Sequence, residues 1–124
     1  MVVKSYRDLT VWQKAMELVE LVYKLAAKLP REEKYGLTAQ LQRAAVSIPS
    51  NIAEGHARES TREYLRYLLI ARGSMAELET QLLLCVRLGL LTESGIAQAS
   101  AVSDEVGKMI RGLQHSLDEK LRNS

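Results

Sequence analysis

The sequence predicts an all-α fold, an up-down-up-down antiparallel four-helix bundle. Apolar residues recur three and four positions apart along four long segments, and no stretch alternates with the period of two that marks a strand. Short connectors join the segments, which favours antiparallel neighbours. With 124 residues, 47% of them hydrophobic, and only two prolines, the chain is predicted to form one domain over residues 1–124.

The first helix is predicted to begin at TVWQ, where Thr10 and Gln13 have the spacing of a capping box. Two adjacent apolar stripes follow and cover about half of the helix circumference. Pro30 closes this helix, because proline cannot donate a backbone hydrogen bond. The charged sequence REEKYG then leads to the next helix.

The second helix is predicted to run from about Gly36 to Gly55 and to continue through Pro49 with a kink. A proline inside a helix removes one hydrogen bond and costs roughly 3 kcal/mol, so most helices end there. Here, however, the apolar face keeps its phase on both sides of the proline, at Leu37, Leu41, Ala44, Ile48 and Ile52. Gly55 suits the left-handed conformation that often follows the end of a helix.

The third helix is predicted from about Thr61 to Leu88, with Ser60 and Glu63 as its capping box. Its apolar residues alternate at four-and-three spacing, which is typical of a bundle seam: Tyr64, Leu68, Ala71, Met75, Leu78, Leu82 and Cys85. Gly73 lies in the middle of this helix and indicates a close approach of another helix. The fourth helix follows Thr92 and keeps the helical period to Leu121.

Arg72 and Glu79 form an unusual pair on the third helix. They are seven residues apart and project in the same direction, among the apolar residues Leu65, Leu69, Ala76, Leu83 and Val86. Charged residues seldom lie in an apolar arc unless they are paired. We therefore expect a buried ion pair completed by a neighbouring helix, and a polar binding pocket is the alternative.

An apolar surface is predicted on the opposite side of the third helix. Ile70, Leu84 and Leu88 interrupt a face that is otherwise polar. Three apolar residues on one side of one helix suggest a contact with a partner. These residues are the predicted oligomer interface.

Arginines gather near the turn between the second and third helices. Arg58, Arg62 and Arg66 form the clearest basic group, and Arg43 on the second helix is predicted to join them in a phosphate-facing patch. Glutamates interleave with these arginines at positions 59 and 63, which favours the alternative of a solvated charged face.

Several functional classes lack support in the sequence. The single cysteine, Cys85, excludes an internal disulfide, and neither a signal pattern nor a membrane-length apolar run is present, so we expect a cytoplasmic protein. His56 and His115 have no metal-type spacing, and no phosphate loop or nucleophile elbow occurs. We therefore expect no catalytic site, metal, cofactor, membrane contact or small-molecule substrate.

Three stretches of the chain carry a family resemblance: YRDLTVWQKA at 6–15, LTAQLQRAAVSIPSNIAEG at 37–55 and YLLIARGSMAELETQL at 67–82. Together they resemble the four-helix-bundle family encoded in intervening sequences of bacterial 23S ribosomal RNA genes. The resemblance implies a bundle that assembles as a homopentamer, in a family with a ribosomal-protein-like label. A structural relative is the accessory protein of diversity-generating retroelements, a basic pentamer that partners a reverse transcriptase and nucleic acid.

The sequence thus predicts a non-enzymatic oligomer that acts as a scaffold or adaptor and contacts RNA or a ribonucleoprotein through its arginines. The alternative is a protein-only interaction module whose apolar surfaces bind a helix of another protein. The net charge of one chain is only +2, so a nucleic-acid contact must depend on where charges cluster and on how many copies assemble.

Overall fold

The computed structural model describes residues 2–124, which form four long helices: α1 (Thr10–Ala26), α2 (Leu37–Ala57), α3 (Thr61–Arg87) and α4 (Glu93–Arg122). Two short 3-10 helices, η1 (Tyr6–Asp8) and η2 (Arg31–Glu33), precede α1 and α2. No strand occurs in this range. The predicted all-α class is therefore confirmed.

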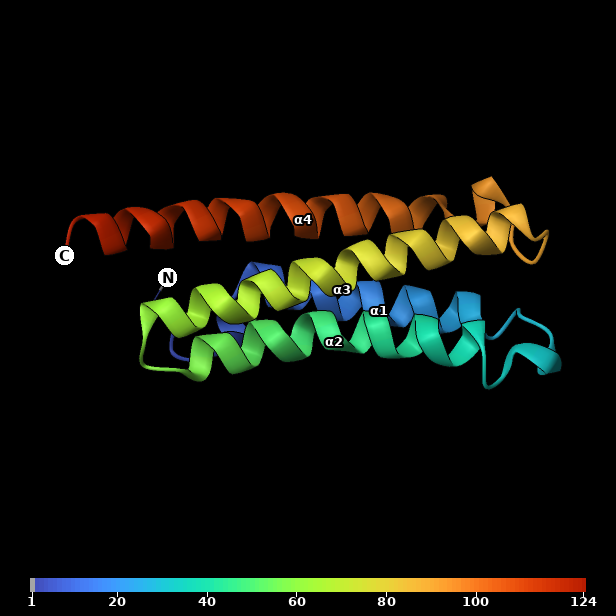
Figure 1. Cartoon of the computed structure of the whole chain (residues 1–124), viewed down its shortest axis with the longest axis horizontal. Helices are drawn as coiled ribbons and strands as arrows, with labels where there is room; N and C mark the ends of the chain where they lie inside the picture. The colour runs from blue at the N-terminus through green and yellow to red at the C-terminus, as the bar shows by residue number, and fades with distance from the viewer. Residues whose placement is uncertain (1) are drawn as a thin grey trace.

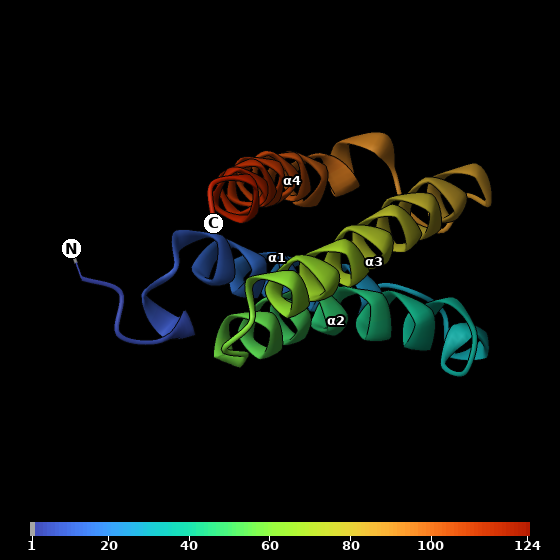
Figure 2. The same cartoon turned by 60° about the vertical axis from the view of Figure 1, so that its left-hand side comes forward.

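The four helices form an antiparallel bundle in which helices that follow one another in sequence lie side by side (Figure 1). The most extensive contact is between α2 and α3, and α4 completes the bundle by packing on both α3 and α1. Figure 2 shows α3 crossing the bundle at an angle, while the N-terminal segment runs away from the helices. The up-down-up-down arrangement is that predicted from the short connectors.

The core is aliphatic and draws on all four helices. Its largest fully buried side chains are Leu18, Leu41, Ile48, Ile52, Leu68, Leu78, Leu82 and Ile110. Each lies on the apolar stripe expected of its helix, because a helix in a bundle buries one stripe and leaves the rest exposed. None of the described helices combines the length and apolar character that crossing a bilayer requires.

The helix α2 continues through Pro49, as the unbroken apolar phase predicts. Pro49 is buried, and the flanking Ile48 and Ile52 are both fully buried in the core. Burial of these side chains offsets the hydrogen bond that the proline removes. The helix ends at Ala57, two residues beyond the predicted end, and the kink at Pro49 stays a prediction.

Gly55 does not have the predicted role of a left-handed cap. It lies inside α2 and is buried, and among the described residues only Gly89, between α3 and α4, has a positive φ, at +73°. A Cβ at position 55 would lie 2.7 Å from the Cβ of Tyr67 and 3.1 Å from Cδ1 of Tyr64. Gly55 therefore permits the close approach of α2 to α3.

The start of α1 also differs from the prediction. Thr10 and Gln13 form no capping box: Leu9 is the N-cap residue, and Nε2 of Gln13 donates to the carbonyl oxygen of Arg7 at 2.9 Å. A capping box does form one turn earlier, in η1, between Ser5 and Asp8. The predicted capping box was thus assigned to the wrong turn of the chain.

Gly55 in α2 and Gly73 in α3 provide a matched test of this packing. No atom lies within 4 Å of a Cβ built at Gly73, so the predicted close approach there is wrong for the single chain. We expect Gly55→Ala to lower the free energy of unfolding by about 1–3 kcal/mol through overpacking. Gly73→Ala should raise it by about 0.5–1 kcal/mol through helix propensity. Urea denaturation measures both changes, and equal effects would contradict the assigned contact.

Candidate functional site

The turn between α2 and α3 brings arginines from both helices to one end of the bundle. Arg58 is the C-cap residue of α2 and has an extended backbone, which ends the helix. Ser60 caps α3, since its hydroxyl accepts a hydrogen bond from the backbone amide of Glu63 at 3.2 Å. This cap is the half of the predicted capping box that forms, because the Glu63 carboxylate pairs with Arg66 instead.

Tyr67 lies at the centre of this basic cluster. The guanidinium carbons of Arg58 and Arg66 are 5.1 Å and 4.9 Å from its ring centroid, which is within cation–π range. Nη2 of Arg58 donates to the Tyr67 hydroxyl at 2.8 Å, and this hydroxyl is 3.3 Å from Oε1 of Glu54. The sequence analysis did not include Tyr67, although its position next to Arg66 was a usable signal.

Glutamates neutralise much of the cluster. Arg58 binds Glu54 at 3.1 Å, and Nε of Arg66 binds Glu63 at 2.9 Å. The hydrogen bond from Arg66 holds the pKa of Glu63 below its usual value, so this carboxylate stays charged at neutral pH. Arg62 is exposed and forms no ion pair with any residue in the range 2–124. It is the arginine most available to a phosphate.

Arg43 does not join the other three arginines. It lies fifteen residues before Arg58 on α2, which corresponds to about 22 Å along the helix axis. There it lines a polar groove together with Ser47, Ser74, Glu77 and other residues of α2 and α3. The predicted four-arginine patch is therefore corrected to Arg58 and Arg66 around Tyr67, with Arg62 exposed on the first turn of α3.

The predicted buried ion pair between Arg72 and Glu79 does not form in the single chain. Both side chains are exposed. Nη1 of Arg72 donates to Oε1 of Gln114 at 3.2 Å, and Oε1 of Glu79 accepts from the Ser103 hydroxyl at 3.3 Å. The pairing fails because seven residues separate the two groups by about 10 Å along one helix, and α4 offers each of them a neutral partner instead.

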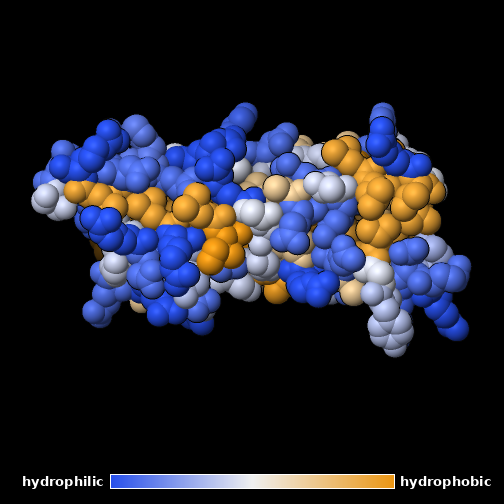
Figure 3. Space-filling model, in the orientation of Figure 1, coloured by the Kyte–Doolittle hydropathy of each residue, from blue (hydrophilic) through white to orange (hydrophobic). Residues whose placement is uncertain are grey.

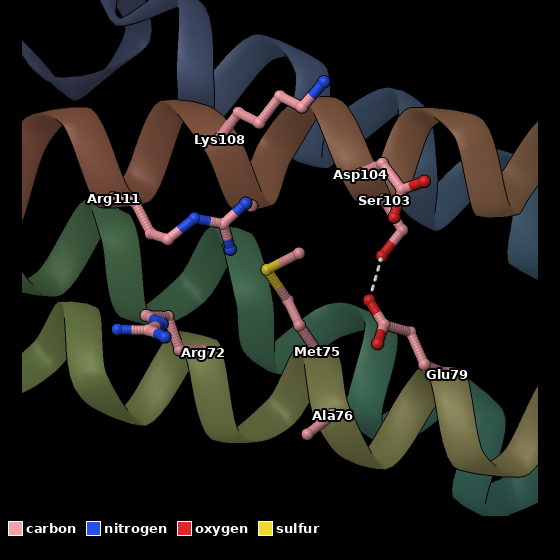
Figure 4. Close-up of a pocket in the computed structure, with 9 residues that line it drawn as sticks. Arg72, Met75, Ala76, Glu79, Ser103, Asp104, Lys108 and Arg111 are labelled. Atoms are coloured by element: carbon pink, nitrogen blue, oxygen red, sulfur yellow. Dashed lines mark hydrogen bonds between the residues drawn. The ribbon is translucent and has the colours of Figure 1, made fainter.

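Arg72 and Glu79 line a groove of about 340 Å³ between α3 and α4. Met75 forms part of its floor, and α4 contributes Asp104 and Arg111. Figure 4 shows the two arginines toward one end of the groove and the two acids, with Ser103, toward the other. The groove is thus polar, as the alternative interpretation of this pair expected, and Lys108 of α4 also lines it, between Arg111 and Asp104 (Figure 4).

Exposed apolar side chains occur on two sides of α3. The predicted oligomer residues Ile70, Leu84 and Leu88 are 41%, 42% and 58% exposed. Leu69 and Leu83, which the sequence places beside Arg72 and Glu79, are 58% and 60% exposed. Figure 3 shows one apolar area over the end where α3 joins α4 and a second one between α3 and the C-terminal part of α4. Exposure of this extent is typical of interaction surfaces.

The other residues considered for chemistry have ordinary packing roles. The His56 ring meets the edge of Tyr64, with 5.7 Å between centroids, and burial raises the pKa of Tyr64 to about 12, so that its phenol stays neutral. Cys85 is buried, and this burial raises the pKa of its thiol. Residues 2–124 contain no group of three or more His, Cys, Asp or Glu side chains that could hold a metal ion.

Comparison with known proteins agrees with this architecture. The family model for the 23S rRNA-intervening sequence protein matches residues 7–112. A crystal structure of a protein of unknown function from the S23 ribosomal protein family of Bacteroides thetaiotaomicron has a TM-score of 0.78 and 25% sequence identity. That match covers 85% of this chain and 98% of the other. No curated protein matches. Since the family model spans most of the sequence, the chain belongs to the 23S rRNA-intervening sequence protein family.

Proposed function

We propose that the protein is a non-enzymatic, oligomeric scaffold or adaptor of the cytoplasm that contacts RNA or a ribonucleoprotein. The contact surface is the cluster of Arg58, Arg62 and Arg66 at the turn between α2 and α3, where Arg58 and Arg66 contact Tyr67. This surface needs no cofactor and no small-molecule substrate, because it would bind the phosphate backbone of the RNA. Guanidinium groups suit this task, since they are always charged and donate hydrogen bonds in a fork.

The arrangement of Arg58 and Arg66 around Tyr67 is the observation that supports the proposal most. The ring and the hydroxyl of Tyr67 hold the Arg58 side chain at the turn, so less conformational freedom is lost when it binds a phosphate. Arg62 lies on the same turn without a carboxylate partner. No element here has the form of a base-reading motif, so binding should depend on phosphates and be largely indifferent to sequence.

Assembly would make this weak cluster effective. One chain has a net charge of only +2, whereas the five chains implied by the family resemblance would carry +10 together. A ring would repeat the cluster around its rim, and linked weak sites bind one long ligand far more tightly than a single site does.

The proposal predicts salt-dependent RNA binding that the three arginines control. For the wild type, affinity for single-stranded RNA should fall steeply as salt rises. For the Arg58→Ala, Arg62→Ala, Arg66→Ala triple variant, the slope of log K against log salt should be shallower by about 2, at about 0.7 per lost phosphate contact. Fluorescence anisotropy with a labelled RNA measures both slopes.

A control with the same change in net charge replaces Lys24, Lys28 and Arg31 by alanine. These exposed residues lie near the end of α1, at the opposite end of the bundle from the cluster. This control should retain the wild-type slope. Equal slopes for the wild type and the cluster variant, or no binding at low salt, would contradict the RNA proposal.

A protein-only interaction module is the second candidate function, because exposed leucines favour it. Leu84 and Leu88 lie on the back of α3, the same side as Ile70 and about 21 Å or more farther along the helix axis, and all three are at least 41% exposed. On this alternative, the apolar surface takes a helix of another protein and the arginines form a solvated face. Absence of RNA binding at low salt would favour it.

We expect the back of α3 to act as a subunit contact in a closed oligomer, with five subunits on the basis of the family resemblance. Multi-angle light scattering at micromolar concentration should therefore give a mass several times that of one chain. Changing Leu84 and Leu88 to aspartate should lower this mass, because charges would then be buried in the contact. A monomeric wild type would refute the ring.

The resemblance to the accessory protein of diversity-generating retroelements leads to a separate proposal about the RNA partner. If the two proteins share a role as well as a fold, the gene should lie beside a reverse transcriptase gene. A position within a ribosomal RNA gene would favour a ribosomal partner instead.

A further inference from the structure

Two faces of the bundle present exposed apolar side chains, and both faces include α2. On the outer side of α1 and α2, Met16, Tyr23 and Val46 are each at least 40% exposed. On the back of α3, which lies toward α2, Ile70 and Leu84 are each at least 41% exposed. We refer to these surfaces as the α1–α2 face and the α2–α3 face. Apolar exposure on two different faces suggests two different contacts for each copy.

The α2–α3 face is a groove whose charged residues have no partner in the chain. Two cavities of about 330 and 390 Å³ adjoin along it and share Glu77, and Arg43 of α2 lines the first of them. Both charged side chains are exposed, and neither forms an ion pair with any residue from 2 to 124. Gly73 lines the second cavity, and no atom lies within 4 Å of a Cβ built there. A helix from outside the chain can therefore approach α3 closely at Gly73.

The α1–α2 face carries charged residues at the same level of the bundle as Arg43. Val19 of α1 and Val46 of α2 line one groove of about 320 Å³, and the two helices are antiparallel (Figure 1). Glu20 and Lys24 follow Val19 by one and five residues, and Arg43 precedes Val46 by three. At 1.5 Å per residue, these three charged residues therefore lie within about 6 Å of one another along the bundle axis.

Glu77 of α3 lies at this level too. The hydroxyls of Ser47 and Ser74 are 2.7 Å apart, so these two residues define the register of α2 against α3. Glu77 follows Ser74 by three residues and is therefore level with the residue next to Arg43. Glu20, like Lys24, is exposed and forms no ion pair within the described range. One level of the bundle thus carries an unpaired acid and an unpaired base on each face.

The angle between the two faces suits a small closed ring. Each subunit of a ring contacts its two neighbours through different faces, and in a five-membered ring these faces point about 108° apart. The helix pairs α1–α2, α2–α3, α3–α4 and α1–α4 pack as the four sides of a square, so adjacent sides point about 90° apart. The α1–α2 face and the α2–α3 face are adjacent sides. Opposite sides would instead lead to a filament.

We propose that the α1–α2 face of one copy packs on the α2–α3 face of the next copy, with the bundle axes parallel to the ring axis. Rotation about that axis keeps each residue at its level, so Glu20 meets Arg43 of the next copy and Lys24 meets its Glu77. The apolar side chains of the two faces cover one another around these charges. This proposal rests on the ring proposed above and identifies the two surfaces that close it, and it is independent of the RNA proposal.

Charge exchange within one chain tests this contact. Glu20→Arg and Arg43→Glu each oppose like charges at every contact, so each alone should raise the concentration at which the ring half dissociates by about tenfold or more. The double variant should regain the wild-type value, because the opposite charges meet again. Asp118→Arg and Arg122→Glu, on exposed positions of α4, are the charge-matched controls and should keep that value. Lys24→Ala in the RNA control removes an attraction without adding a repulsion, so its ring should persist. Light scattering over a dilution series measures these concentrations.

Two glycines provide a second, compositionally identical comparison. Gly73 and Gly112 are both exposed within helices, and a Cβ built at either meets no atom within 4 Å. Gly73→Arg should dissociate the ring, because a long charged side chain would fill the α2–α3 face. Gly112→Arg, on α4, should leave the ring intact. Circular dichroism should show unchanged helicity for both variants, which separates loss of the contact from loss of the fold.

The outcomes separate this contact from the ring itself. A monomeric wild type overturns the ring and the contact together. A wild-type ring that Glu20→Arg, Arg43→Glu and Gly73→Arg all leave intact overturns the contact alone. Single charge variants that dissociate without recovery in the double variant also overturn it, because Glu20 and Arg43 then do not meet.

Discussion

The helices α2 and α3 lie close together because Gly55 presents no side chain to Tyr64 and Tyr67. This approach forms the most extensive helix contact in the bundle, and it fixes which stripe of α3 faces inward. The stripe of α3 that carries Ile70 and Leu84 is left to the surface, as are Leu69 and Leu83. It also holds Tyr67 beside the end of α2, where Arg58 can reach it. The arginine cluster and the exposed back of α3 thus depend on one glycine-permitted approach.

Most of the fold could be predicted from the sequence, because helical periodicity records which stripe of each helix is buried. The phase argument for α2 held across Pro49, since Ile48 and Ile52 must share a face if the helix continues. The Ser60 cap could also be predicted, because it depends only on Ser60 and the three residues that follow it. The errors at Thr10 and Gly73 have one cause: a capping or packing signal identifies a residue type but not the neighbour that it meets.

The candidate site was less predictable, because it depends on which helices meet. Spacing along α3 shows that Arg72 and Glu79 share a face, yet it cannot show that Gln114 and Ser103 of α4 lie beside them. Arg43 was assigned to the arginine patch for the same reason. Its distance from Arg58 follows from the rise per residue of a helix once α2 is known to be continuous. The apolar residues around Arg72 and Glu79 were read as interior, although Leu69 and Leu83 are exposed in one chain.

A polar contact at the edge of the interface between α2 and α3 has a consequence for how the two helices align. The hydroxyls of Ser47 on α2 and Ser74 on α3 are 2.7 Å apart, and Nδ2 of Asn51 donates to the Ser47 hydroxyl at 2.9 Å. If α3 slid along α2 by two turns, the leucine spacing would still match, but the hydrogen bond between the two hydroxyls would be lost, and each would keep only its partner on its own helix, Asn51 for Ser47 and the Ile70 carbonyl for Ser74. Loss of this one hydrogen bond would disfavour the shifted register by about 0.5–1.5 kcal/mol. Aliphatic packing alone would tolerate several alignments of the two helices, and the hydrogen bond between the two serines favours the observed one.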